Sequence, residues 1–160
     1  MGRIYSAIFN GVAVTAQQDF FEVLSAADSV TVVHAIELNQ STETGDAAEE
    51  MLAILMVRGI GSVTSGSGGS TATAQPMADG DAAFGGTVEI NNTTKMVVGT
   101  GTLETLAAWT WNVRMPFEKI FTPELRPVIS PGNRLTIELG TTPADSITIS
   151  GTIWLEEIGG

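Results

Sequence analysis

The chain has 160 residues, a formal net charge of −11 and no cysteine, and only 16% of its residues are charged. This length fits one domain with a core of its own. The acidic balance argues against general nucleic-acid binding, because phosphates would be repelled, and the lack of cysteine excludes disulfides and thiolate metal sites. The low charged fraction is typical of chains that bury surface against other chains, and equally of a β-sandwich with a bland surface.

The first forty residues predict strands. Residues 3–15 are typical of a hairpin, because Asn10-Gly11 separates two strand-like runs and suits a tight type I′ turn. A short strand is predicted at 19–24 and a long one at 30–39. Alternation along the long strand places its only histidine on an apolar face.

The middle of the chain is less regular. A polar loop is expected at 41–48. Residues 49–60 have apolar spacing that fits a helix, but they also read as a buried strand, and we favour the strand because their neighbours look β. The Gly/Ser-rich stretch 61–75 is expected to be flexible alone and ordered against a partner.

Further strands are predicted at 87–90, 96–103 and 108–115, the last with Trp109 and Trp111 on one face. These two tryptophans either fill the core or a subunit contact, or form an exposed platform on which a sugar stacks.

Residues 116–131 contain four prolines, which disfavour a helix or a central strand. We expect an extended arm on the surface, with Phe117, Ile120 and Phe121 packed down. Arg126 lies within the basic stretch 114–134, which is either a solvated rim or a contact for an acidic neighbour.

The closing strands, 134–139 and 146–158, are predicted to form a hairpin that seals the core. Trp154 falls on the polar face of the last strand, where a monomer has little reason to place it. The predicted fold is all-β: one antiparallel β-sandwich domain over 1–160, jelly-roll-like, with about eight to ten strands.

No catalytic constellation is evident. His34 is the only histidine and is interpreted as a core or interface residue, and no Gly-x-Ser-x-Gly elbow is present. The carboxylate pairs Asp79/Asp81 and Glu156/Glu157 are interpreted as solvated charge. We therefore expect no enzyme activity, no cofactor and no metal. The opening Met1-Gly-Arg-Ile-Tyr also lacks the features of a secretory signal, so a signal peptide is not expected.

The residues expected to contact other chains are large aromatics and one arginine of the arm and closing strands: Trp154, Trp109, Trp111, Phe117, Phe121 and Arg126. Trp, Tyr and Arg are enriched where binding energy concentrates.

The order of segments resembles small β-sandwich proteins encoded in the structural gene clusters of tailed bacteriophages. The resemblance is carried by Gln18-Asp-Phe-Phe-Glu-Val-Leu, the Gly-Ser-Gly-Gly loop, Asp79-Gly-Asp-Ala-Ala-Phe-Gly-Gly, and the ending Pro143-Ala-Asp-Ser-Ile-Thr-Ile-Ser-Gly-Thr-Ile-Trp-Leu-Glu-Glu-Ile. It implies a virion protein on the capsid surface, made in the bacterial host cytoplasm: a decoration or cement protein, often a homotrimer, that binds the major capsid protein. No functional residue follows from it.

Two functions therefore stand from the sequence. The first is a capsid decoration protein that works by multivalent non-covalent contacts, without nucleic acid or membrane. The alternative is a carbohydrate- or receptor-binding β-sandwich module.

Overall fold

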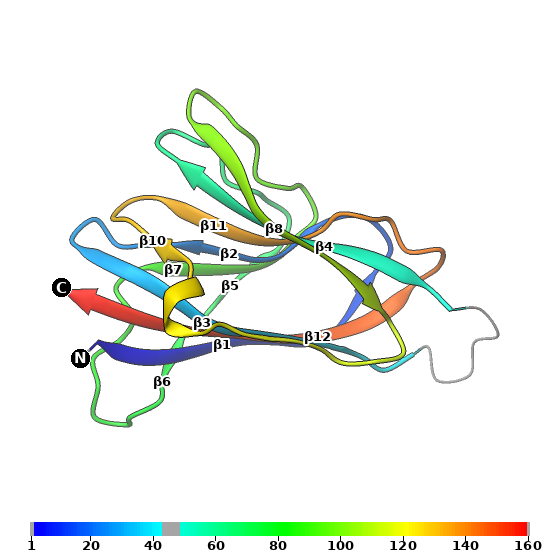
Figure 1. The fold of residues 1–160 in the computed structure, drawn as a ribbon, viewed down its shortest axis with the longest axis horizontal. Helices are drawn as coiled ribbons and strands as arrows, with labels where there is room; N and C mark the ends of the chain where they lie inside the picture. Colours follow the sequence, from blue (N-terminus) through cyan, green and yellow to red (C-terminus); the bar gives the residue numbers. More distant parts are fainter. Residues whose placement is uncertain (1, 43–48, 160) are drawn as a thin grey trace.

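The computed structural model describes residues 2–42 and 49–159. In this part of the chain twelve strands and one turn of 3-10 helix occur. The strands form two antiparallel sheets that stack as a sandwich (Figure 1). The all-β sandwich prediction is confirmed, although the number of strands is higher than expected. Among the described residues, no helix is long and apolar enough to cross a bilayer.

Each sheet contains six strands. Those of sheet A are β1 (Arg3–Val14), β3 (Ser29–Gln40), β6 (Gln75–Pro76), β9 (Phe117–Ile120), β10 (Val128–Ile129) and β12 (Ile147–Gly159). Those of sheet B are β2 (Asp19–Leu24), β4 (Met51–Ile60), β5 (Ser70–Ala72), β7 (Thr87–Asn92), β8 (Thr102–Asn112) and β11 (Arg134–Leu139). The 3-10 turn η1 (Pro123–Leu125) joins β9 to β10.

The connections follow a jelly-roll path. Sheet A has the order β1-β12-β3 with both β9 and β10 on the far side of β3, and sheet B has the order β2-β11-β4-β8. Successive long strands therefore change sheets, except β4 and β8, which pair in sheet B; this is the path of two Greek keys. The short strands β5, β6 and the longer β7 are inserted between β4 and β8.

The core lies between the sheets and is built by alternate side chains of the long strands. Seven apolar residues of β11 and β12 are fully buried: Leu135, Ile137, Leu139, Ile147, Ile149, Ile153 and Leu155. Both closing strands seal one core, as the sequence predicts. They do not form a hairpin, however, because β11 lies in sheet B and β12 in sheet A.

The predicted N-terminal hairpin is also wrong. Residues 3–14 form one strand that pairs with β12 along its length, from Arg3 opposite Glu157 to Val14 opposite Ile147. The register shifts between Phe9 and Val12, so Asn10 and Gly11 form a β-bulge instead of a turn. Gly11 has a positive φ of 64°, which a type I′ turn would also require.

A second bulge changes the faces of β3. The register with β12 shifts between Trp154 and Leu155, which lie opposite Ala35 and Val33, and His34 is the extra residue. The predicted apolar face that His34 shared with Ile36 is therefore wrong: Ile36 is in the core, whereas His34 is only half-buried and bonds to Glu156.

Other segments divide between confirmed and wrong predictions. Residues 51–60 form β4, so the strand interpretation is confirmed. Residues 96–103 do not form a strand of their own, because β8 begins only at Thr102. The stretch 61–75 packs on its own chain, through bridges Thr64–Val97 and Ser67–Thr94 and through β5. The predicted loop 41–48 lies mostly outside the described residues.

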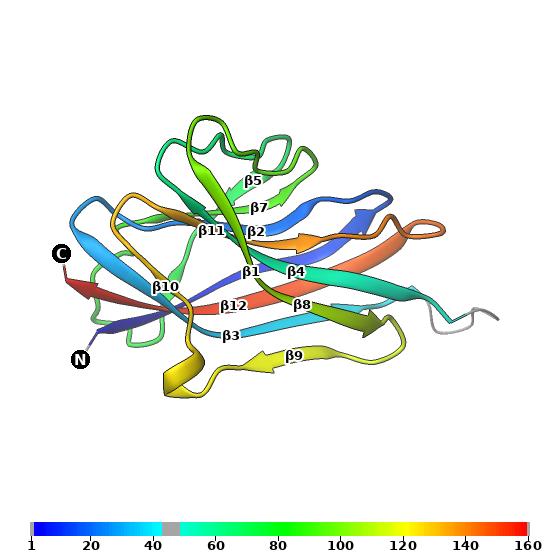
Figure 2. The same ribbon diagram turned by 45° about the horizontal axis from the view of Figure 1, so that its top comes forward.

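The proline-rich arm lies along the edge of sheet A (Figure 2). Both β9 and β10 pair with β3, and the Phe121 N–H donates to the His34 carbonyl at 2.9 Å. Phe117 is buried and Phe121 partly buried, as expected. Ile120 is 73% exposed, so the prediction that it packs down is wrong.

Candidate functional site

The outer face of sheet A presents a row of side chains that crosses four strands. Ser6, Trp154, Ala35 and Ile120 lie opposite one another in the register of β1, β12, β3 and β9. Residues directly opposite in neighbouring strands share a face of the sheet. A half-buried tryptophan and an exposed isoleucine therefore stand on either side of a single alanine.

A pocket of about 350 Å³ lies at this row, and we call it the Trp154 pocket. The small Ala35 side chain leaves room between its larger neighbours, and β9, β12 and the residues after β9 provide the walls. The other side chains that define its chemistry are His34, Glu118, Phe121 and Arg126. Three predicted contact residues, Trp154, Phe121 and Arg126, thus meet in one place.

A hydrogen bond between His34 and Glu156 fixes one wall of the Trp154 pocket. The Glu156 carboxylate contacts His34 Nε2 at 2.8 Å and accepts a hydrogen bond from the Gly2 N–H at 2.9 Å. Burial alone would raise the pKa of Glu156, but these bonds and the charges of His34 and Arg126 hold this pKa below its usual value. Glu156 therefore stays charged and keeps the bulged His34 in place.

Arg126 contributes an unsatisfied donor. Its Nε is buried and has no hydrogen-bond partner in the structure. A buried unpaired donor costs free energy, so the guanidinium has more to gain from an incoming acceptor than a solvated arginine would have.

The other three predicted contact residues line a second pocket of about 390 Å³, between β8 and β9. Trp111 is buried, and its Nε1–H donates to the Met115 carbonyl at 2.6 Å. Trp109 packs its ring against Phe117 at 5.6 Å, with Lys119 Nζ 5.6 Å from the ring centre. Trp111 therefore cannot form an open platform for a sugar, whereas Trp109 is half-buried and lines the pocket.

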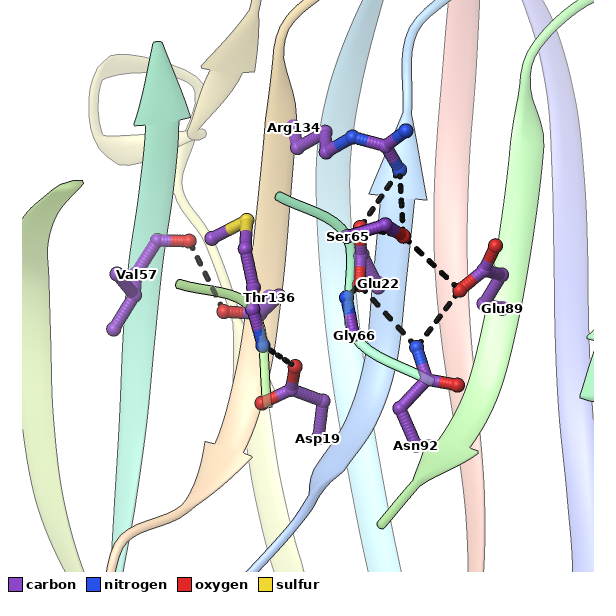
Figure 3. A network of polar contacts seen from close by, with 10 residues as sticks. Asp19, Glu22, Val57, Ser65, Gly66, Glu89, Asn92, Arg134 and Thr136 are labelled. Atoms are coloured by element: carbon purple, nitrogen blue, oxygen red, sulfur yellow. Dashed lines mark hydrogen bonds and ion pairs between the residues drawn. The ribbon is translucent and has the colours of Figure 1, made fainter. Parts of the chain in front are cut away.

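The outer face of sheet B holds a buried polar network that the sequence analysis missed (Figure 3). Glu22 of β2 is almost fully buried and accepts from Arg134 at 2.7 Å, from the Ser65 hydroxyl at 2.8 Å and from the Gly66 N–H at 2.8 Å. Asn92 donates to Glu22 and to Glu89. The network ties the 61–69 loop to sheet B, so Arg134 is part of a buried pair and not of a solvated basic rim.

Asp19 belongs to the same face and is fully buried. One carboxyl oxygen accepts from the Met96 N–H at 2.7 Å, and the other has no partner in the structure. Burial, together with the charges of Glu138 and Glu22, raises the pKa of Asp19 to about 7, against the lowering effects of the Met96 bond and Lys95. Asp19 thus holds the 93–101 loop as an acid that is protonated below neutral pH.

The prediction that Glu156 and Glu157 are solvated is wrong. Glu157 is 2% exposed and binds Arg3 at 3.0 Å, the Ser29 hydroxyl at 3.2 Å and the Gly85 N–H at 2.9 Å. This carboxylate connects β1, β3, β12 and the 76–86 segment. Its role is to hold the two chain ends together.

A local signal for the buried acids did exist in the sequence. The strand 19–24 reads Asp-Phe-Phe-Glu-Val-Leu, in which two acids stand among four large apolar residues. Charged residues are almost never buried unless they are paired, so that pattern indicates a network, but not its partners. Among the described residues, no group of three or more His, Cys, Asp or Glu side chains is placed to hold a metal ion.

Comparison with known proteins adds little to this geometry. No protein-family model matches the chain, and no curated protein matches it. A similar solved structure is the crystal structure of the infectious bursal disease virus VP2 subviral particle, with 12% identity over 100% of this chain and a TM-score of 0.14. The match covers 39% of the VP2 chain. At that TM-score the likeness carries no argument about fold or function.

Proposed function

We propose that this protein is a structural virion protein that binds the outside of a tailed-bacteriophage capsid and stabilises it, as a decoration or cement protein. The observation that carries the proposal is the Trp154 pocket: a half-buried tryptophan and a 73% exposed isoleucine on a rigid sheet face. An aromatic anchor beside a pocket is typical of a protein-binding surface.

The expected binding free energy fits a contact that is weak as a single copy and strong when several copies bind together. Burying one isoleucine side chain contributes about 1.5–3 kcal/mol, and ordering the partner offsets part of it. A homotrimer on a capsid would repeat the contact at fixed geometry, and linked sites bind far more tightly than one site does. The proposal therefore joins the Trp154 pocket to a trimeric protein and a major capsid protein as partner.

The test uses procapsids and expanded capsids of the phage whose structural genes include this chain. The purified protein is mixed with capsids at micromolar concentration, and bound protein is measured after sedimentation. We expect saturable binding and a higher temperature of capsid disruption. Absence of binding to both capsid forms at this concentration would end the proposal.

A carbohydrate- or receptor-binding module is the second candidate. Its one supporting feature is the Trp154 ring, which is half-buried beside charged groups that could bond a sugar hydroxyl. A glycan array followed by tryptophan fluorescence separates the two functions. Quenching by a glycan that disappears in Trp154→Ala and persists in Trp109→Ala would favour this candidate.

A further inference from the structure

The Trp154 pocket has a basic end, where Arg126 and His34 lie beside the Glu156 carboxylate, and an acidic end, where Glu118 lies. In β10, Val128 lies opposite Val32 of β3. The preceding Pro127 carbonyl accepts a hydrogen bond from the Val33 N–H at 2.9 Å. Continuing this antiparallel register by one residue places Arg126 at the level of His34. Glu118 of β9 lies opposite Glu37 of β3, three residues further along β3. The apolar row of Trp154, Ala35 and Ile120 falls between these levels.

At each end, one polar or charged group lacks a favourable partner. At the basic end, the Arg126 charge already interacts with Glu156, whose pKa it lowers, but the buried Nε donor has no acceptor. At the acidic end, Glu37 and Glu118 are like charges directly opposite on paired strands, which is destabilising. Glu37 accepts one hydrogen bond from the Asn39 amide, whereas Glu118 is exposed. An incoming acceptor would satisfy the first end, and an incoming cation the second.

We infer that the Trp154 pocket binds an extended segment of the partner protein that presents an acidic, an apolar and a basic side chain on one face. The apolar side chain lies over Ala35 between Trp154 and Ile120. The acidic group bonds Arg126, and the basic group lies between Glu37 and Glu118. This inference rests on the proposed docking function and specifies its partner chemistry.

The spacing of the partner residues follows from strand geometry. Side chains on one face of an extended chain recur every second residue, with a rise of about 3.3 Å per residue. The levels of His34 and Glu37 are three residues apart on β3, and the bulge at His34 makes their separation shorter than the roughly 10 Å of three regular rises. An extended segment with the acid at position i, the apolar residue at i+2 and the base at i+4 covers this span, with side-chain reach at each end.

The experiment measures binding of blocked peptides to the full chain by ¹H–¹⁵N NMR. The probe is Ac-Gly-Asp-Ser-Leu-Ser-Lys-Gly-NH2. Three controls of equal length replace its charges by two aspartates, replace them by two lysines, or replace its leucine by serine. We expect shifts confined to the Trp154 indole and to residues around Ala35 and Ile120. The probe should bind at least about fivefold more tightly than each control.

A charge reversal sharpens the test. In Arg126→Glu the basic end becomes acidic, so we expect the preference to pass to the peptide with two lysines. The surface variant Arg58→Glu, on sheet B, should keep the wild-type preference. Equal binding of all charged peptides, or shifts away from Trp154, would overturn the inference.

Two further outcomes separate this inference from the function on which it rests. Selective peptide binding without capsid binding would refute the decoration role and leave the pocket chemistry intact. Capsid binding that is unchanged in Arg126→Glu would refute the pocket chemistry alone. A wild-type dimer that Arg126→Glu dissociates and Glu118→Arg restores would identify a second copy as the occupant, and would overturn the inferred partner segment.

Discussion

At the scale of single residues, the buried acid Asp19 makes the protein respond to pH. Its folded pKa of about 7 is above the ordinary value of 3.8. The folded state therefore binds a proton more tightly than the unfolded state does. The stabilising contribution of the protonated acid is complete below about pH 4 and is lost as the pH rises through about 7.

Asp19→Asn tests this residue directly. Asparagine imitates the protonated acid: its side-chain oxygen can accept from the Met96 N–H, and it carries no charge toward Glu138 and Glu22. We expect the wild type, relative to the variant, to lose on the order of 1 kcal/mol of unfolding free energy per pH unit between pH 5 and 7. Urea denaturation at pH 5, 6, 7 and 8 gives the difference, and a difference independent of pH would contradict the raised pKa.

The positions of some single side chains could be predicted from the sequence, and those of others could not. The six predicted contact residues do line two pockets beside β9, because large aromatics follow the alternation of their strands. Ile120 and His34 were placed on the wrong faces. The position of His34 depends on the bulge in β3, and that of Ile120 depends on the pairing of β9 with β3 at the edge of sheet A. Neither the bulge nor this pairing has a local sequence pattern.

At the scale of elements, the bulge in β1 depends on one glycine. Gly11 has φ 64°, a left-handed conformation that costs other residues about 1–2 kcal/mol, and an added methyl group would meet no atom within 4 Å. We expect Gly11→Ala to lower the free energy of unfolding by about 1 kcal/mol. Gly80→Ala is the matched control, because it too has open space but lies outside the left-handed region.

Urea denaturation of both variants decides this point. The control should change stability by less than about 0.5 kcal/mol. Equal effects in the two variants would mean that the β1 bulge does not require a left-handed residue.

The 61–69 loop is held by Glu22, and that attachment can be measured. Glu22→Gln leaves Arg134 without its anionic partner in a mostly buried site, with Arg134 22% exposed. Breaking a fully buried pair costs about 3–5 kcal/mol, and partial exposure lowers our expectation to roughly 2–4 kcal/mol. Amide exchange at residues 64–67 should accelerate. The control Glu104→Gln removes the exposed partner of Arg58 and should cost less than about 1 kcal/mol.

The prediction is that Glu22→Gln lowers the free energy of unfolding much more than Glu104→Gln does. Similar small losses in both, with unchanged exchange at 64–67, would show that the loop is held by other contacts.

Most elements, but fewer connections, could be predicted from the sequence. The predicted strands at 19–24, 30–39, 51–60 and 134–139 all occur in the structure, although the bulge at His34 breaks the alternation of 30–39. The two supposed hairpins failed because turn signals specify a local change of direction or a bulge, and not the sheet that receives the next strand. Sheet assignment depends on contacts between distant residues, such as the pairing of β1 with β12.

At the scale of the whole molecule, the proposal requires a stable oligomer. The closed jelly roll leaves the Trp154 pocket on the outer face of sheet A, so self-association need not cover it. We expect light scattering at micromolar concentration to give three times the chain mass of 16.7 kDa. A protein that stays monomeric at high concentration would contradict the proposed trimer and the multivalent binding that depends on it.

The central claim is that the Trp154 pocket is the surface that docks on capsids, and one pair of variants tests it most directly. Ile120→Glu places a charge at the pocket on a side chain that is 73% exposed, so the fold should tolerate it. Val98→Glu makes the same change on the 93–101 loop over sheet B, at a side chain 49% exposed. Binding isotherms on expanded capsids should show at least a tenfold loss of affinity for Ile120→Glu and none for Val98→Glu. Equal affinity of Ile120→Glu and wild type, with both variants folded, would contradict the account.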